Sequence, residues 1–350
     1  MSYEVAIGST AGATDISDWV NVGNVNVFQA TGISLSALGT YYASVRAVDA
    51  ENLKGSVTTG DGWLVSACPA GYIPVPGNTT AGLGGIVYAQ GTKSNYDWTG
   101  ASETIHTTAD FCVMKYEAKD GGSHTAVSVA AGFPWVSIQR EQAGADNDAQ
   151  EACENNGAGY QLIGNQHWQA IARNLESVAS NYDTSGPVAD YTFNHGHADA
   201  SPNNALAADA DDANACLGVT SNGDPDDDCG GVWHINKRSH ELSNGEVIWD
   251  LSGNVLEWVR DNNSSSQGSN GFIQAVSYSD ALKFGPSGDF TVQTGTQKAG
   301  LGYFYDGSAG AVFRGGLWHD GASAGPFYAA LFGGWAGSGS GVGFRCVLAP

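Results

Sequence analysis

Two short motifs bring together side chains that could do chemistry. The motif "GASAG" matches the strained turn that carries the nucleophile of serine hydrolases, with Ser323 at the nucleophile position. In those enzymes a histidine follows the serine along the chain, whereas all 8 histidines here precede Ser323. The motif "HGHAD" offers His195, His197 and Asp199 to a metal ion, but alternating residues in an Asn-rich loop are more typical of solvated side chains. We therefore expect neither a serine hydrolase nor a metal centre from these motifs.

A third candidate is the acidic stretch "ANACLGVTSNGDPDDDCGG", which a bridge between Cys216 and Cys229 could close into a loop. Carboxylates at alternating steps are the ligands that calcium loops use. Those of this stretch belong to Asp224, Asp226, Asp227 and Asp228. Because the full EF-hand spacing and its terminal Glu are missing, we expect a solvated acidic loop.

The composition limits the elements that must position these side chains. The chain has 350 residues, 42% of them hydrophobic, which excludes a disordered protein and favours one large domain plus a smaller one. A net charge of -22 disfavours nucleic acid and anionic membrane surfaces as partners. No apolar run approaches the ~20 residues of a membrane span, and no secretory signal opens the sequence. The chain is thus expected to be either cytoplasmic or an excised fragment.

Six dispersed cysteines without a CxxC pair favour disulfides over metal binding, with free buried thiols as the alternative. The first sixty residues alternate apolar and polar positions in "YEVAIGS" and "YYASVRAVDA", which predicts β-strands. Residues 1–62 resemble a truncated fibronectin type III-like module, a partial β-sandwich that lacks its opening strands. We therefore expect the chain to begin inside a longer, multi-module surface protein.

Residues 63–350 predict an α+β domain of short strands, Gly-rich turns and two helices. The first helix, around "DAQEACENNG", carries Cys153 and is expected to end at Gly157. The second, "NQHWQAIARNLESVAS", has Asn165 as its expected N-cap. One apolar face of this helix is expected to consist of Trp168, Ile171, Ala172, Leu175 and Val178. Residues 183–245 are expected to be loop-like.

Three stretches in this domain carry a resemblance: "GYQLIGNQHWQAIARN", "VIWDLSGNVLEWVRD" and "FRGGLWHDG", the last followed by "GFRCVL". Their order and spacing resemble the C-type lectin fold of the formylglycine-generating-enzyme type over residues 68–350. That family contains oxidases and non-enzymatic binding proteins diversified by retroelements. The oxidases carry two copper-binding cysteines shortly after RGG, at places that fall near Asp320 and Gly325 here. Without thiolates there is no soft Cu(I) site, so the resemblance implies no copper and no enzyme.

In the diversified proteins, the variable segment lies between RGG and GFRC, about residues 314–346. Its variable positions derive from Asn codons with randomised adenines, which cannot yield Trp, Met, Lys, Glu or Gln. Positions that fit this rule are Leu317, His319, Asp320, Ser323, Ala330, Phe332, Gly333, Gly337, Gly339 and Gly341. Trp318 and Trp335 do not fit it and are expected to be scaffold. Tyr328 is a further candidate anchor for a ligand, with core packing as the alternative for it and for Trp335.

The resemblance also implies a structural calcium site in the "WDLSGNVLEW" turn. Its ligands would be the side chains of Asp250 and Glu257 and the carbonyls of Gly253 and Val255, with an ordinary hydrogen-bonded turn as the alternative. The fold further implies a Cys153–Cys346 disulfide, which leaves Cys68 for Cys112.

The sequence thus predicts a non-enzymatic binding protein at the cell surface or outside the cell, with a diversified surface. The expected ligand is a protein or glycan on another cell or a virus, and neither nucleic acid nor membrane insertion is expected. A fixed-specificity lectin or adhesin is the alternative, and a formylglycine-generating oxidase is a less favoured one.

Overall fold

The computed structural model divides the chain into two compact units, residues 1–69 and 70–350. It describes residues 1–25, 28, 30, 33, 40–60, 62–64, 68–77, 85–86, 105–106, 109–141, 148–176, 178–183, 193–219, 229, 234–263, 270–272, 284–285, 300–307, 310–333 and 338–348. The boundary falls a few residues after the predicted one at 62, because a short strand at residues 63–64 still pairs within the first unit.

The first unit contains one sheet in its described part, with the strand order β2-β1-β3-β4 and with β5 paired to β3. The strands are β1 (Ser2–Gly8), β2 (Ser17–Gly23), β3 (Thr40–Val48), β4 (Thr58–Thr59) and β5 (Trp63–Leu64). Arg46 connects neighbouring strands, since it pairs with Glu4 at 2.7 Å and lies 4.0 Å over the Trp19 ring. The predicted strands are therefore present, whereas the described residues form a single sheet and not the two layers of a sandwich.

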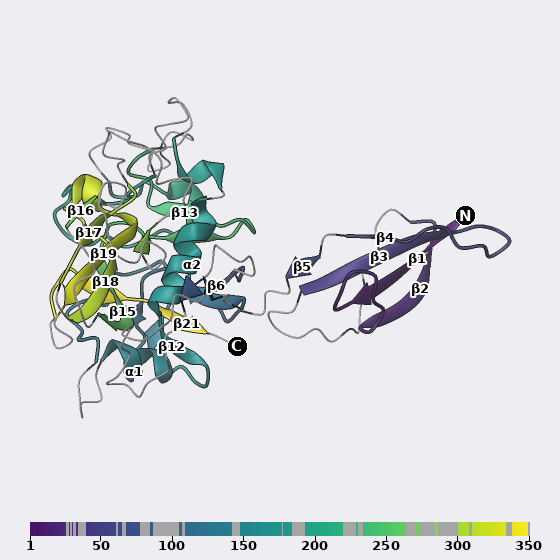
Figure 1. The fold of residues 1–350 in the computed structure, drawn as a ribbon, viewed down its shortest axis with the longest axis horizontal. Coiled ribbons are helices and arrows are strands. Elements are labelled where there is room, and N and C mark those ends of the chain that lie inside the picture. The colour runs from purple at the N-terminus through teal and green to yellow at the C-terminus, as the bar shows by residue number, and fades with distance from the viewer. Residues whose placement is uncertain are drawn as a thin grey trace. The chain divides into compact units, whose positions relative to one another are not determined.

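The second unit is mostly β-sheet with few helices (Figure 1). A six-stranded sheet has the order β16-β17-β19-β18-β15-β20, and a four-stranded sheet has the order β12-β21-β9-β6. The six strands are β15 (Leu256–Asn263), β16 (Gly271–Phe272), β17 (Tyr303–Tyr305), β18 (Gly310–Gly315), β19 (Gly325–Gly333) and β20 (Val342–Phe344). The four are β6 (Tyr72–Val75), β9 (Phe111–Met114), β12 (Tyr160–Leu162) and β21 (Cys346–Leu348).

Three two-stranded sheets complete the described strands of this unit. They pair β7 (Gly85–Ile86) with β8 (Ile105–His106), β10 (Lys119–Asp120) with β11 (Ala126–Val127), and β13 (Ser239–Glu241) with β14 (Val247–Trp249). The last hairpin lies partly within the stretch that the sequence predicted as loop.

Helix α1 (Ala149–Glu154) begins after Asp148, whose side chain accepts a hydrogen bond from the Glu151 amide. It carries Cys153, as predicted, and ends before Gly157. Helix α2 (Asn165–Glu176) has Asn165 as its first helical residue and not as the predicted N-cap, and it packs against β15 and β19. Four of the five predicted apolar side chains of α2 are fully buried, whereas Val178 lies beyond the helix end and is only half-buried.

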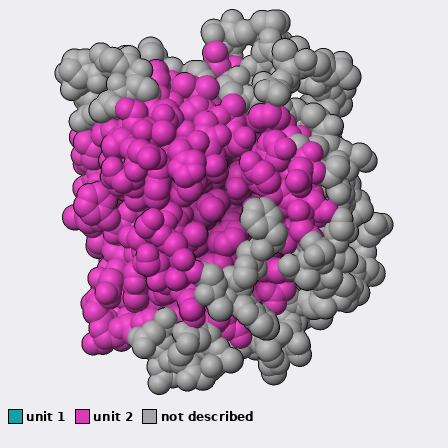
Figure 2. Space-filling view, turned by 90° about the vertical axis from the view of Figure 1, so that its left-hand side faces the viewer, with its two compact units in different colours: residues 1–69 teal, residues 70–350 magenta. Residues whose placement is uncertain are grey.

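Two disulfides match the predicted pairings: Cys153–Cys346 joins α1 to β21, and Cys216–Cys229 closes a short loop. Cys68 and Cys112 are also disulfide-bonded, and none of the described cysteines is free. Such bonds are compatible with an extracellular protein. No helix within the described ranges is both long and apolar enough to cross a membrane. Figure 2 shows the described residues of the second unit as one continuous body.

Candidate binding surface

The RGG motif ends strand β18 and turns the chain toward the surface. Arg314 is fully buried between the rings of Trp168 and Phe284, each 5.8 Å away. Gly315 and Gly316 have φ values of 88° and 95°, a region in which side chains are strained. A Cβ on Gly316 would lie 2.8 Å from the backbone of Ala324, so only glycine allows this close approach. The motif is therefore a structural requirement of the turn.

Residues 317–323 follow as an exposed loop that ends in a short 3-10 helix, Gly321–Ser323. His319 is exposed, while Leu317, Asp320 and Ser323 are half-buried. The Asp320 carboxylate accepts a hydrogen bond from the Leu317 amide at 2.9 Å, which fixes the turn. Trp318 is buried, as a scaffold residue would be.

A second loop, residues 198–204, lies against this one. Trp318 donates its indole hydrogen to Asn203 at 2.9 Å and accepts at its carbonyl from the Ala200 amide at 2.7 Å. The Gly321 amide donates to the Ala198 carbonyl at 2.7 Å. The two loops thus form one surface, which sequence reasoning missed because the second loop lies more than a hundred residues earlier in the chain.

The preceding "HGHAD" motif corrects one prediction. His195 and His197 are buried and not solvated, and burial lowers the pKa of both rings. His197 contacts the Asn204 carbonyl at 2.9 Å and Asp199 at 3.4 Å. Within the described residues no three His, Cys, Asp or Glu side chains are grouped closely enough to hold a metal.

The side chains of the two predicted calcium ligands, Asp250 and Glu257, each face an arginine. The Asp250 carboxylate accepts hydrogen bonds of 2.8 and 2.7 Å from Arg238, and the Glu257 carboxylate accepts bonds of 2.7 and 2.5 Å from Arg345. All four side chains are buried. Because each carboxylate faces a guanidinium group in a two-pronged arrangement, its oxygens already have strong partners. These oxygens are hydrogen-bonded within the protein, as in the alternative to a calcium site, and calcium binding stays a prediction.

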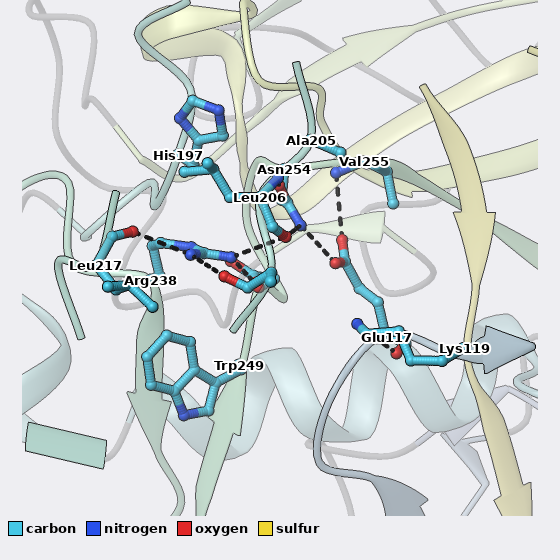
Figure 3. A network of polar contacts seen from close by, with 12 residues as sticks. Glu117, Lys119, His197, Ala205, Leu206, Leu217, Arg238, Trp249, Asn254 and Val255 are labelled. Carbon is cyan, nitrogen blue, oxygen red and sulfur yellow. Dashed lines mark hydrogen bonds and ion pairs between the residues drawn. The ribbon is translucent and has the colours of Figure 1, made fainter. Parts of the chain in front are cut away.

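Gly253 and Val255, whose carbonyls are the other expected ligands, lie in the same buried turn, and Figure 3 shows Val255 beside Glu117. A Cβ on Gly253, whose φ is 72°, would lie 2.4 Å from the His197 carbonyl oxygen. Val255 donates its amide to the Glu117 carboxylate at 3.2 Å. Asn254 donates to the same carboxylate at 2.5 Å. Burial, with the charge of Asp250 adding to it, raises the pKa of Glu117 well above its usual range.

Asn254 connects this buried network to the 317–323 loop and to the chain that follows the 198–204 loop. Its side-chain oxygen accepts from the Leu206 amide at 2.7 Å, and its backbone carbonyl accepts from the Trp318 amide at 3.1 Å. Arg238 adds bonds to the carbonyls of Ala207 and Leu217 (Figure 3). The "SGNVLEW" motif therefore holds these segments in place from the protein interior. Glu117 had no signal in the sequence, because its partners lie far away along the chain.

The GFRC motif closes the segment from the other end. Gly341 lies under Leu317 and Trp318, since an added Cβ would approach the Leu317 side chain to 2.5 Å. Gly339 accepts from the Ser137 amide at 3.0 Å. Arg345 is buried on Glu257, and Cys346 follows in the disulfide to α1. The structure thus brings the predicted positions 317 and 341 together.

Strand β19 contains the remaining described candidates. Successive side chains of a strand point to opposite faces, and Phe327, Ala329 and Leu331 belong to the main core. Tyr328 and Ala330 alternate with them and are 4% and 1% exposed. This burial corrects their assignment as ligand contacts and supports the packing alternative for Tyr328.

Phe332 and Gly333 end strand β19, with Gly333 opposite Ala311 of β18. The Phe332 side chain lies outside the described residues, as do Trp335, Gly337 and the acidic loop at 224–228.

Strand β17 adds two tyrosines that the sequence did not single out. Tyr303 and Tyr305 are half-buried, with ring centroids 4.3 Å apart, and Tyr305 lies 5.7 Å from Tyr328. Tyr305 pairs in register with Ala330. The short aromatic sequence of β17 contains no turn or motif, so the sequence does not indicate that these tyrosines lie near a site.

Comparisons with known proteins add no identification. No family model matches the chain, and no curated protein matches it significantly.

Proposed function

We propose that this chain is a non-enzymatic binding protein that presents residues of the segment 314–346 to a ligand. The scaffold would be a C-type lectin fold of the formylglycine-generating-enzyme type, and the surface would be diversified by a retroelement. The proposed setting is extracellular or at the cell surface, in agreement with the disulfides. The ligand would be a protein or glycan of another cell or a virus.

One contrast carries this proposal. The residues that frame the segment, Arg314 and Arg345, are fully buried and engaged in the scaffold, whereas His319 between them is exposed and Leu317 and Asp320 are half-buried. A segment that served only the core would not alternate in this way, since unpartnered polar side chains are costly to bury. A diversified surface requires a segment whose ends are fixed in the scaffold and whose middle tolerates substitution.

Two alternatives remain distinct from this proposal. A fixed-specificity lectin or adhesin would use the same surface without variation in its sequence. An oxidase of the related type would need a thiolate pair near Asp320 and Gly325, where this sequence has no cysteine. Copper-dependent turnover of a thiol peptide by the purified protein would favour that enzyme instead.

Deep sequencing of the encoding locus across its source population tests the proposal. We expect changes at 317, 319, 320 and 323, restricted to adenine-derived codons, with Arg314, Gly316 and Arg345 constant. Ala330 should also stay constant or small, because its side chain is buried. A uniform segment would refute diversification and favour the fixed lectin, and changes that include the buried arginines would refute the assigned surface.

A further inference from the structure

The Asp320 carboxylate is half-buried and, unlike those of Glu257, Asp250 and Asp212, it is not part of an ion pair with a Lys or Arg. Glu257 and Asp250 pair with arginines, and Asp212 pairs with Lys115. Among the described residues no Lys or Arg lies within ion-pair distance of Asp320. Burial raises the pKa of the Asp320 carboxyl group, and this effect outweighs the lowering by the Leu317 amide and by the charge of His319. This carboxylate is therefore partly desolvated and not neutralised.

The position of this carboxylate is fixed before any ligand arrives. Its Oδ2 atom accepts from the Leu317 amide at 2.9 Å, and the Asp320 amide donates back to the Leu317 carbonyl at 3.0 Å. The Ser323 amide donates to the Asp320 carbonyl at 3.0 Å, and Gly321 is tied to Ala198. A charged group held by several backbone bonds loses little conformational entropy when it binds.

Two tyrosine rings of strand β17, Tyr303 and Tyr305, lie beside the turn that carries this carboxylate. The Tyr305 side chain is hydrogen-bonded to Ser323, three residues after Asp320, and it faces Tyr303 at 4.3 Å. Ser323 lies in the short 3-10 turn that follows Asp320 and donates its amide to the Asp320 carbonyl at 3.0 Å, so its bond to Tyr305 holds the phenol beside this turn. Burial, followed by the negative charge of Asp320, raises the pKa of Tyr305. Both tyrosines keep part of their surface open to solvent. A carboxylate beside tyrosine rings attracts cations through charge and through the ring faces.

We propose that Asp320, Tyr305 and Tyr303 form a subsite for a basic side chain, a lysine ammonium or an arginine guanidinium, of a protein ligand. The proposal rests on the proposed binding function and specifies the chemistry of its partner. The net charge of -22 favours the approach of a basic partner surface over a neutral or acidic one. The cation would gain a carboxylate that lacks a basic partner in the free protein.

The test is an NMR titration of the full chain with isotope-labelled tyrosine rings, assigned through Tyr303→Phe and Tyr305→Phe. The probe is N-acetyl-lysine methylamide, and the matched uncharged probe is N-acetyl-norleucine methylamide. We expect saturable shifts of the Tyr303 and Tyr305 rings with the lysine probe and affinity at least about tenfold lower for the norleucine probe.

The charge is removed by Asp320→Asn, which keeps an oxygen to accept from the Leu317 amide. Asp120→Asn is the matched control, because Asp120 is exposed and likewise accepts from a backbone amide of its turn, that of Gly122. The lysine probe should bind Asp320→Asn at least about tenfold more weakly and Asp120→Asn within about twofold of wild type. If Asp320→Asn does not fold, weaker wild-type binding at high salt is the required result.

The proposal is overturned by any of three results: no shift with the lysine probe, equal binding of both probes, or unchanged binding to Asp320→Asn. Ring shifts with methyl glucoside and none with the lysine probe would identify a glycan platform and also overturn it. These failures are separable from failure of the proposed function. A diversified locus without lysine binding removes only the subsite, whereas lysine binding at a uniform locus removes only diversification.

Discussion

At the scale of single residues, this acidic protein places several of its few arginines in the interior. Arg238, Arg314 and Arg345 are fully buried, and each contacts backbone carbonyls as well as a side chain. Buried guanidinium groups are tolerated only where their donors are matched. The arginines in RGG and GFRC therefore hold strands and turns together through hydrogen bonds to backbone carbonyls.

Arg345 provides the first prediction. Replacing it in Arg345→Met leaves the Glu257 carboxylate buried without its partner, which should cost ~3–5 kcal/mol of unfolding free energy in urea. Lys115→Met is the control, since its pair with Asp212 is half-exposed and is expected to contribute less than ~1 kcal/mol. Addition of Glu257→Leu to Arg345→Met should recover part of the loss. Equal effects of the two single variants would contradict this.

His240 provides a pH prediction. Burial lowers its pKa from 6.5 to about 3, so the folded state keeps the ring neutral while the unfolded chain binds a proton below 6.5. Stability is thus complete above 6.5 and falls with the pH, by ~2.7 kcal/mol at pH 4.5. His240→Gln, which keeps a donor for the Asn194 carbonyl, should remove that part of the pH slope.

The comparison between wild type and His240→Gln isolates the histidine. Glu117 has a raised pKa in the folded state and therefore acts in the opposite direction, as it favours folding when the pH falls. Because Glu117 is present in both proteins, its contribution cancels in the difference. Identical pH slopes for the two proteins would show that His240 is protonated in the folded state.

Residue roles were predictable from the sequence only where local patterns determine them. The Cys216–Cys229 bridge, which closes a short loop, belongs to this group, whereas the Cys153–Cys346 pairing was implied only by the family resemblance. The arginine partners of the expected calcium ligands could not be predicted, because nothing local in the sequence places Arg238 on Asp250 or Arg345 on Glu257. An ion pair across many residues leaves no pattern in the sequence.

At the scale of elements, the exposed loop depends on the strand that precedes it. Strand β18 delivers Arg314 to the core, and two glycines with positive φ then reverse the chain. Strand β19 returns directly, with Gly315 opposite Gly325. Apolar periodicity predicted α2 well. Strand β19 is apolar at almost every position, so the sequence could not show which of its side chains are buried and which are exposed.

Gly316 tests this dependence. Gly316→Ala places a Cβ 2.8 Å from Ala324 at a φ of 95°, so the return of the loop must shift, at a cost of ~1–3 kcal/mol. Gly321→Ala is the matched control, because its φ is 55° and no atom lies within 4 Å of the added Cβ. Urea unfolding should show a clearly larger loss for Gly316→Ala. The reverse order would mean that the turn is not held by close packing.

At the scale of the whole molecule, the division into two units and the combination of short strands with two helices in the second unit were predictable from composition and alternation along the chain. The number of layers in the first unit did not, since strand pairing depends on contacts that alternation does not specify. The contacts of Asn254 with Glu117, Leu206 and Trp318 could not be predicted either, because each joins residues at least 48 positions apart in the sequence.

The charge of -22 acts on the whole molecule. Like charges on the surface repel one another in the compact state, and this repulsion is screened beyond ~10 Å at 0.1 M salt. The pairs Arg345–Glu257 and Arg238–Asp250 are buried and little affected by screening. The midpoint of thermal unfolding should therefore rise by a few degrees as sodium chloride increases from low to physiological concentration. A fall in the midpoint would mean that exposed ion pairs outweigh the repulsion, contrary to the scarcity of Lys and Arg in this sequence.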